Sequence, residues 1–304
     1  MKPAVLRVVR SCDIVLVDIG SVLSPEGLES FRAAIVERFV RDNPVYHDAR
    51  RYRRPCRHIP RQVSLFQEDR VARAAPRTGT SADLFDNPDA EVSAEMIEWH
   101  LPRGAETTLR RMLAEYLPDV RVVWEDRTVR PSAGLFRLNG ELRDYQSDVV
   151  TAAIKAGQGV IQAPTGSGKT VIACGLVAAS GLNTLFVVHT SVLLEQTAAA
   201  VRRFLGVEPG IIGAGRDEPA PVTVAMVQTL GRRNPAPLHP LFGMVILDEA
   251  HHCPAESFKS IVGSFPAACR FGLTATPTRK DRLHPVLFDV VGPIITRVDA
   301  RNLM

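Results

Sequence analysis

The sequence predicts an α/β protein in which a parallel sheet, covered by helices on both faces, follows a small α+β region. From about residue 142 onwards, continuously apolar runs alternate with helical patterns, as in sheets whose parallel strands are connected by helices. A glycine-rich turn, residues 163–170, stands between one such run and a helical segment. Before about residue 130 this alternation is lost. We therefore expect two domains, residues 1–130 and 131–304.

Five apolar runs supply the expected strands of the second domain. They are almost uninterrupted by polar residues, which is typical of strands buried on both faces. Parallel strands end at one edge of their sheet, so we expect the functional residues to follow these runs and to gather at that edge. The runs are residues 159–163, 184–189, 222–225, 244–248 and 270–274.

The first domain shows a different pattern. Residues 14–17 favour a strand, and Ser24 with Pro25 begins a helix that carries an apolar stripe. A second helix over residues 105–117 and an alternating strand over residues 120–124 follow. Turn-forming residues between 73 and 92 show no period and predict a flexible loop. The helical stripe consists of Leu28, Phe31, Ile35 and Phe39.

Composition limits the class of protein. The 304 residues are 45% hydrophobic and 23% charged, enough for a substantial core. The net charge of +4 permits nucleic-acid binding without requiring it. No apolar run approaches the roughly 18 residues of a membrane span. Arg7 and Arg10 lie where a signal peptide would have its uninterrupted apolar core. The sequence thus predicts a cytoplasmic protein without a membrane partner, and its five scattered cysteines fit neither a zinc nor a disulfide pattern.

The turn over residues 163–170, APTGSGKT, has the spacing of a phosphate-binding loop between strand and helix. Glycines allow the backbone N–H groups to approach the phosphates, a lysine reaches the β- and γ-phosphates, and a hydroxyl ligates Mg²⁺. We therefore expect a nucleoside triphosphate to be bound with Mg²⁺, with Thr170 as a metal ligand. The candidate nucleotide-binding residues are Thr165, Gly166, Ser167, Gly168, Lys169 and Thr170.

Two adjacent carboxylates, Asp248 and Glu249, end the apolar run at residues 244–248. At the end of a buried strand that follows a phosphate-binding loop, such a pair divides its roles. Asp248 is expected to hold Mg²⁺ through water, and Glu249 to act as general base on the attacking water. Together with Lys169 they form the predicted catalytic set.

Four segments resemble the first RecA-like lobe of superfamily 2 DEAD/DEAH-box DNA helicases: LRDYQ (142–146), APTGSGKT (163–170), DEAH (248–251) and GLTATP (272–277). The chain is most similar to the branch of type III restriction subunits, XPB and UvsW-like enzymes. LTATPTRKDRL (273–283), GPII (292–295) and LPRG (101–104) also resemble that branch. The resemblance implies a component of an ATP-dependent helicase or translocase that acts on DNA rather than RNA.

The same resemblance implies roles for four further residues. Gln146 would read the adenine edge, which favours ATP and suits an amide that both donates and accepts. Thr274 and Thr276 would relay the nucleotide state to the nucleic acid, with His251 as a bridge. The alternatives are a surface glutamine on a helix and ordinary hydroxyls at the end of a strand.

Two groups of residues are candidates for nucleic-acid contact. The resemblance places phosphate contacts at Thr190, Gln228 and Thr229, each after a strand and before a helix; the alternative is that the hydroxyls only cap helices. Residues 50–61 contain six arginines close to two tyrosines, which suits phosphate contact and stacking, although charged runs also occur as plain solvated faces. The arginines singled out are Arg50, Arg51, Arg53, Arg54 and Arg57.

The resemblance also implies that ATP is cleaved between two RecA-like lobes, and that the second lobe supplies an arginine worth about 10³ to 10⁵ in rate. The sequence ends at Met304, soon after the first lobe, so no second lobe is expected in it. We expect the isolated chain to bind ATP, to hydrolyse it poorly, and to need a polypeptide that carries the second lobe. The alternative function is a nucleic-acid-binding ATP switch, or a truncated helicase, without productive turnover.

Overall fold

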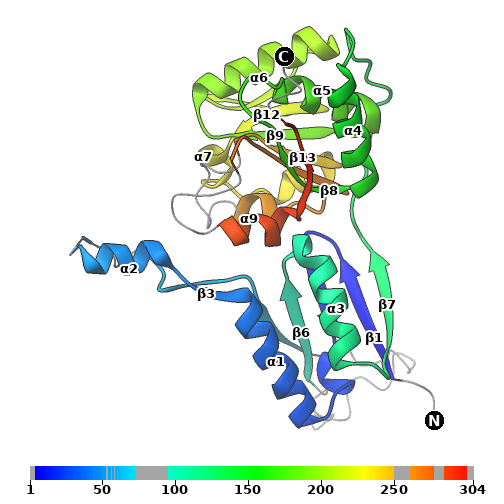
Figure 1. The fold of residues 1–304 in the computed structure, drawn as a ribbon, viewed down its shortest axis with the longest axis vertical. Coiled ribbons are helices and arrows are strands. Elements are labelled where there is room, and N and C mark those ends of the chain that lie inside the picture. The colour runs from blue at the N-terminus through cyan, green and yellow to red at the C-terminus, as the bar shows by residue number, and fades with distance from the viewer. Residues whose placement is uncertain are drawn as a thin grey trace, which may run out of the picture.

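The computed structural model describes residues 4–52, 54–55, 57, 59–72, 95–249, 260–276 and 284–299. The N-terminal unit and the C-terminal lobe each contain one large sheet (Figure 1), and residues 40–42 and 62–64 form a third, two-stranded sheet. The predicted loop at residues 73–92 lies outside the described residues. Within the part that is described, no helix combines the length and apolarity needed to span a membrane.

The N-terminal unit is built on a five-stranded sheet in the order β5-β6-β2-β1-β7, in which β1 pairs parallel with β7 and the other neighbours are antiparallel. Helices α1 (Pro25–Phe39) and α3 (Glu106–Tyr116) share one apolar core with this sheet. The strands are β1 (Val5–Arg10), β2 (Ile14–Val17), β5 (Gln67–Ala72), β6 (Glu95–Leu101) and β7 (Arg121–Asp126).

Helix α1 has the N-terminal cap and the apolar stripe that the sequence predicted. The Ser24 side chain accepts a hydrogen bond from the Gly27 N–H at 3.2 Å, and Pro25 occupies the first turn, where its missing N–H costs nothing. Phe31, Ile35 and Phe39 recur every four residues and are fully buried. The apolar stripe therefore fixes which face of α1 meets the sheet.

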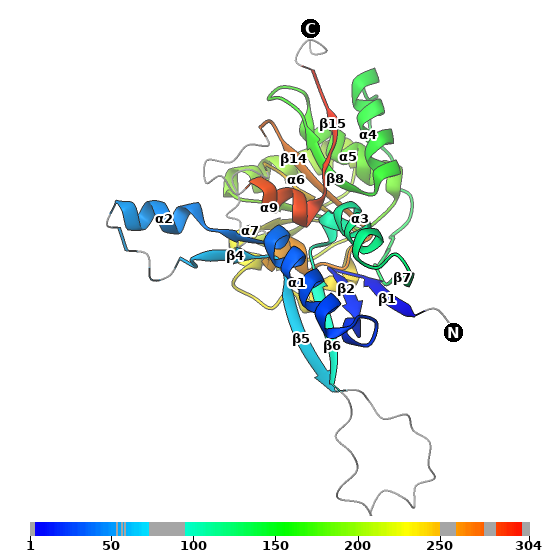
Figure 2. The same cartoon turned by 60° about the horizontal axis from the view of Figure 1, so that its bottom comes forward.

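An extension of the N-terminal unit, which we call the arm (residues 40–64), carries the basic segment. Strands β3 (Val40–Asp42) and β4 (Gln62–Ser64) pair antiparallel, and α2 (Pro44–Arg51) projects away from the body of the molecule (Figures 1 and 2). The buried Asn43 fixes its base, because Oδ1 accepts from the Val45 N–H at 3.1 Å and Nδ2 donates to the Pro60 carbonyl at 2.9 Å.

The C-terminal lobe contains an eight-stranded sheet in the order β11-β10-β12-β9-β13-β14-β8-β15, parallel except for β11. All five predicted strands are confirmed; they are β8 (Gln158–Gln162), β9 (Thr184–Val188), β12 (Val222–Met226), β13 (Met244–Leu247) and β14 (Cys269–Thr274). The remaining strands are β10 (Gly210–Gly213), β11 (Arg216–Glu218) and β15 (Ile294–Arg297).

Helices cover both faces of this sheet, as predicted. Alternate strand residues such as Ile161 and Ile246 share a core with the first three helices of the lobe, whereas Val160 and Val245 face the other core. That core also contains apolar side chains of two later helices among the described residues. The first three are α4 (Asp144–Ala156), α5 (Lys169–Ser180) and α6 (Ser191–Leu205); the others are α7 (Val227–Leu230) and α9 (His284–Val291).

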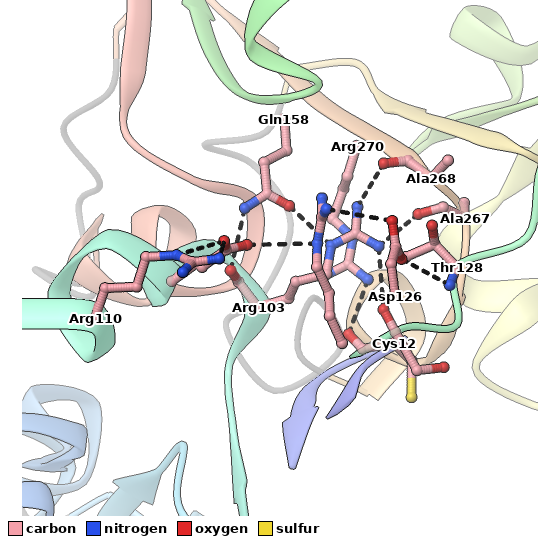
Figure 3. A network of polar contacts seen from close by, with 12 residues as sticks. Cys12, Arg103, Arg110, Asp126, Thr128, Gln158, Ala267, Ala268 and Arg270 are labelled. Carbon is pink, nitrogen blue, oxygen red and sulfur yellow. Dashed lines mark hydrogen bonds and ion pairs between the residues drawn. The ribbon is translucent and has the colours of Figure 1, made fainter. Parts of the chain in front are cut away.

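Arginines join the two units. Arg103 of the N-terminal unit donates to the Gln158 side chain at 2.8 Å and to the carbonyls of Ala267 and Ala268 at 2.5 and 3.1 Å (Figure 3). In the opposite direction, Arg270 donates to the Cys12 carbonyl at 3.0 Å. Because both guanidiniums are buried, this seam is a packed interface rather than a loose contact between domains.

Asp289 of α9 strengthens the seam from another side. Arg38 and Arg41 of the N-terminal unit contact its buried carboxylate at 2.7 and 2.8 Å. The arm, which begins between these two arginines, is thereby anchored to the C-terminal lobe.

Candidate functional site

The predicted site residues follow neighbouring strands of the C-terminal sheet. β8 leads to the loop at residues 163–170, and β13 leads to Asp248 and Glu249, with β14 between them. Since these strands are parallel, their carboxyl ends share one edge. The fold therefore brings the loop and the acidic pair together, as the sequence predicted.

The loop has the backbone of a phosphate cradle. Gly166 and Gly168 adopt left-handed φ values of 86° and 72°, which only glycine adopts without strain. The buried Ser167 turns the loop back by donating its hydroxyl to the Pro164 carbonyl at 2.7 Å. Helix α5 begins at Lys169 without a side-chain cap, so its first N–H groups point to a site suited to an anion.

Gln146 lies directly against this loop. Its Nε2 donates to the Ser167 carbonyl at 3.1 Å, and its Oε1 accepts from the Arg143 N–H at 3.0 Å. A Cβ at Gly168 would meet Nε2 at 2.6 Å, a second reason for glycine at that position. Tyr145, which sequence reasoning missed, donates its hydroxyl to the same carbonyl at 2.9 Å. Gln146 thus positions the loop, and its contact with adenine stays a prediction.

Lys169 and Glu249 form the contact that closes the site. The Lys169 Nζ lies 3.2 Å from the Glu249 Oε1, and the lysine side chain is only 11% exposed. Glu249 has a φ of 48°, an uncommon conformation for a residue with a side chain. Its N–H donates to the Asp248 Oδ1 at 2.9 Å. The turn after β13 is thus held in a strained shape that presents both carboxylates.

The ionised form of Asp248 is disfavoured in the folded protein. Burial raises the pKa of its carboxyl, and the Glu249 charge raises it further, while the Glu249 N–H and Lys169 act in the opposite direction. A cation placed between these carboxylates would stabilise their ionised forms. Carboxylate and hydroxyl oxygens, such as those of Asp248 and Thr170, are ligands that Mg²⁺ prefers.

Replacing Asp248 with Asn is expected to stabilise the nucleotide-free protein at neutral pH. With a raised pKa, the folded state binds the Asp248 proton more tightly than the unfolded chain does, so stability is lost as pH rises through that pKa. Asn stays neutral and can still accept the Glu249 N–H. Melting temperatures from pH 4 to 8 should show a gain for Asp248→Asn that grows with pH.

The control is Asp148→Asn, on the exposed side of α4. Added Mg²⁺ and nucleotide should stabilise the parent chain more than Asp248→Asn. A variant that melts below the parent at pH 8 would contradict the account of Asp248.

Thr274 lies at the end of β14, beside the loop. It is fully buried, its hydroxyl donates to the Thr276 carbonyl at 2.7 Å, and its own carbonyl accepts from the Ala163 N–H at 2.9 Å. The segment at 274–276 therefore contacts the strand that leads into the loop. His251 lies outside the described residues, and the relay role of all three stays a prediction.

The two loops predicted to contact nucleic acid lie together. Gln228 is exposed and donates to the His189 carbonyl at 2.8 Å, which joins the ends of β9 and β12. The Thr190 hydroxyl accepts from the Leu193 N–H at 3.2 Å, so this residue does cap α6. Thr229 is half-buried on α7. Their contact with nucleic acid stays a prediction.

The arm exposes its basic residues. Arg50, Arg51, Arg54 and Arg57 are all exposed, whereas Arg53 lies outside the described residues. Tyr52 is 63% exposed, and the guanidinium carbons of Arg51 and Arg54 lie 5.9 and 5.8 Å from the centre of its ring. Cation and aromatic ring are thus presented together at the end of the projecting helix α2.

Part of this chain is similar to known proteins. Residues 139–279 match the family described as type III restriction enzyme, res subunit. DNA 3'-5' translocase XPB2 of Sulfurisphaera tokodaii is 39% identical over 163 residues, which cover 54% of this chain and 37% of that protein. The probable helicase D10 of Escherichia phage T5 is 37% identical over 134 residues, 44% of this chain and 30% of that protein.

A solved structure extends the likeness in fold. The UvsW helicase from bacteriophage T4 superposes with a TM-score of 0.62 over 95% of this chain and 98% of that one, at 16% identity. Both units of the present structure fall within that coverage. By contrast, the chain spans about a third of the length of XPB2 and D10.

The parallel sheet, the loop after β8 and the acidic pair after β13 define a RecA-like lobe of the P-loop class. Its sequence relatives are helicases and translocases. The chain is similar to type III restriction res subunits over residues 139–279 and to XPB2 over 163 residues, and its C-terminal lobe has the RecA-like fold.

Proposed function

We propose that the chain is the ATP-binding part of an ATP-dependent DNA helicase or translocase. The observation that carries the proposal is the 3.2 Å contact between Lys169 and Glu249, which joins the phosphate loop to the acidic pair. The sequence relatives favour a motor over the alternative of a nucleotide switch without turnover. We retain the division at residues 130/131, and a cytoplasmic location, as predictions from the sequence.

In this proposal each side chain has one role. The backbone of residues 165–170 wraps the phosphates of ATP, and Lys169 leaves Glu249 to contact the β- and γ-phosphates. Thr170 and Asp248 would hold Mg²⁺, which neutralises charge on the phosphates when bound. Glu249, released from Lys169, accepts the proton of the attacking water.

Efficient hydrolysis requires charge stabilisation from the opposite side of the nucleotide. The first lobe supplies Lys169 on its own side, and an arginine on the opposite side would contribute about 10³ to 10⁵ in rate. We propose that this arginine belongs to a second RecA-like lobe, supplied by a partner polypeptide or by further chain.

We propose two DNA-binding regions. Thr190, Gln228 and Thr229 lie at the same sheet edge as the ATP site, where hydroxyl and amide groups can contact backbone phosphates. The exposed arginines of the arm, with Tyr52, offer phosphate contact and stacking at the end of the projecting helix α2 and just beyond it.

Removal of three arm charges tests the proposed function. In Arg50→Ala/Arg51→Ala/Arg54→Ala, the plot of log affinity for duplex DNA against log salt should become shallower by about 0.9 for each phosphate that the arm no longer neutralises. The half-maximal gain in ATP affinity should require more DNA, while the ATP affinity at saturating DNA stays unchanged. Fluorescence anisotropy and an ATP titration measure the two quantities.

A matched control removes three arginines that are already paired with carboxylates: Arg110 with Glu106, Arg127 with Glu125 and Arg202 with Glu208. The net charge changes equally in both triple variants. The arm proposal is wrong if both weaken DNA binding to the same extent, and the motor proposal is wrong if DNA leaves the ATP affinity of the parent chain unchanged.

A further inference from the structure

A cavity of about 250 Å³ lies at the seam between the two units. The N-terminal unit contributes the turn after β1, residues 65–67 and the end of β6. The C-terminal lobe contributes residues 260–264, Arg270 and Val290. None of the residues assigned to ATP or DNA lines it, so it is separate from both proposed sites.

The lining has an excess of positive charge. It includes the guanidiniums of Arg103 and Arg270, which are 0% and 1% exposed, against one carboxylate, that of Asp13. The oxygens that accept from these arginines are backbone carbonyls and the amide of Gln158 (Figure 3). Within the described chain, neither arginine forms an ion pair with a carboxylate.

One donor of Arg270, an arginine that lines the cavity, is unused. The Nε of Arg270 is buried and has no hydrogen-bond partner among the described residues. Buried N–H groups in folded proteins almost always find an acceptor, from the protein, from water or from a ligand. Burial also lowers the pKa of Arg270 to about 10, which still leaves it charged at neutral pH. An acceptor that is itself an anion would satisfy both the donor and the charge.

The carboxylate of Asp13 is already engaged. Its Oδ2 lies 2.7 Å from the His100 Nδ1, and this hydrogen bond raises the pKa of His100. Asp69 and Glu98 also face His100, at 3.5 and 4.0 Å from its Nε2. The Asp13 charge also acts on Arg270 and raises the pKa of its guanidinium, so it offsets part of the positive charge of the cavity.

The remaining walls are apolar. Leu65, Phe66, Leu101 and Val290 line the cavity. Its volume is below the roughly 300–1,000 Å³ usual for ligand sites, so it suits a small molecule. In such sites, a small number of polar groups in an otherwise apolar wall orient the ligand.

We propose that the seam cavity binds a small organic carboxylate, with the anionic group against Arg270 and an apolar body against Phe66 and Val290. Because both units supply walls, the bound molecule stabilises their docked arrangement. The proposal does not depend on the proposed helicase function.

Benzoate is the probe, and benzamide, of nearly the same shape but neutral, is its control. Titration of the full chain at constant ionic strength, followed by NMR or isothermal calorimetry, should show saturable benzoate binding at least about tenfold tighter than benzamide. That factor corresponds to a charge-assisted hydrogen bond at the low end of its range, about 1.5 kcal/mol. This comparison needs no variant. Equal affinities, or no saturable benzoate binding, would overturn the proposal.

Gly263→Leu locates the site. A Cβ at Gly263 would meet only Val290 Cγ1, at 3.9 Å, so the larger side chain can extend into the cavity without a backbone clash. Benzoate binding should be lost in Gly263→Leu and kept in Thr151→Leu, on the exposed side of α4. It should also persist in Lys169→Ala. Binding that survives in Gly263→Leu, or disappears in Lys169→Ala, would assign benzoate to another place.

Discussion

Replacing Glu249 with Gln is expected to lower ATP hydrolysis by about 10² to 10⁴, the usual contribution of a general base. Gln keeps the shape of the side chain, and its Oε1 can still accept from Lys169, which Glu249 contacts at 3.2 Å. The phosphate loop and Mg²⁺ ligands are untouched, so ATP affinity should change little. Single-turnover hydrolysis with DNA present, together with an ATP titration, separates rate from affinity.

Glu195→Gln is the matched control, because Glu195 lies on the exposed surface of α6 and pairs with Arg216. Its hydrolysis rate should equal that of the parent. A Glu249→Gln variant that retained the parental rate would exclude Glu249 as the base.

Replacing Arg103 with Met is expected to destabilise the protein by about 3 kcal/mol or more. The change leaves the carbonyls of Ser11, Ala267 and Ala268 without their donor, at about 1–3 kcal/mol for each unpaired group. Removing a buried charge offsets part of this loss, since burial strongly lowers the pKa of Arg103. Urea titration followed by circular dichroism measures the difference.

Arg110→Met is the comparison. Arg110 is about half exposed and pairs with Glu106 on the same helix, an interaction worth about 0.3–0.5 kcal/mol. If the two variants lost the same stability, the seam would not depend on Arg103.

The sequence allowed prediction of the site because its signals are local. The spacing of residues 163–170 is by itself enough to predict a phosphate-binding loop. The two carboxylates directly follow a predicted strand, and in a parallel sheet this places them at the same sheet edge as the loop. The short strands β10 and β11 and the helix α2 gave no comparable signal. Each has eight residues or fewer, and β11 is defined only by its pairing with β10.

The seam was beyond sequence reasoning for a different reason. Arg103 and Gln158 are 55 positions apart, and Arg270 and Cys12 are 258 apart, so no periodic pattern connects them. The tract Leu101–Gly104 was recognisable as a family feature, but its role becomes apparent only in three dimensions. A Cβ at Gly104 would meet the Asp289 carbonyl at 2.6 Å, so glycine there permits close packing against α9.

The ATP affinity of Lys169→Ala, relative to the parent chain, tests most directly whether the loop and the acidic pair form one nucleotide site. Loss of a charge-assisted hydrogen bond to phosphate is worth about 1.5–3 kcal/mol, so the dissociation constant should rise by about 10- to 150-fold. The measurement is an equilibrium titration with a fluorescent ATP analogue and Mg²⁺, with Lys155→Ala on exposed α4 as control. Unchanged affinity in Lys169→Ala would contradict the assignment.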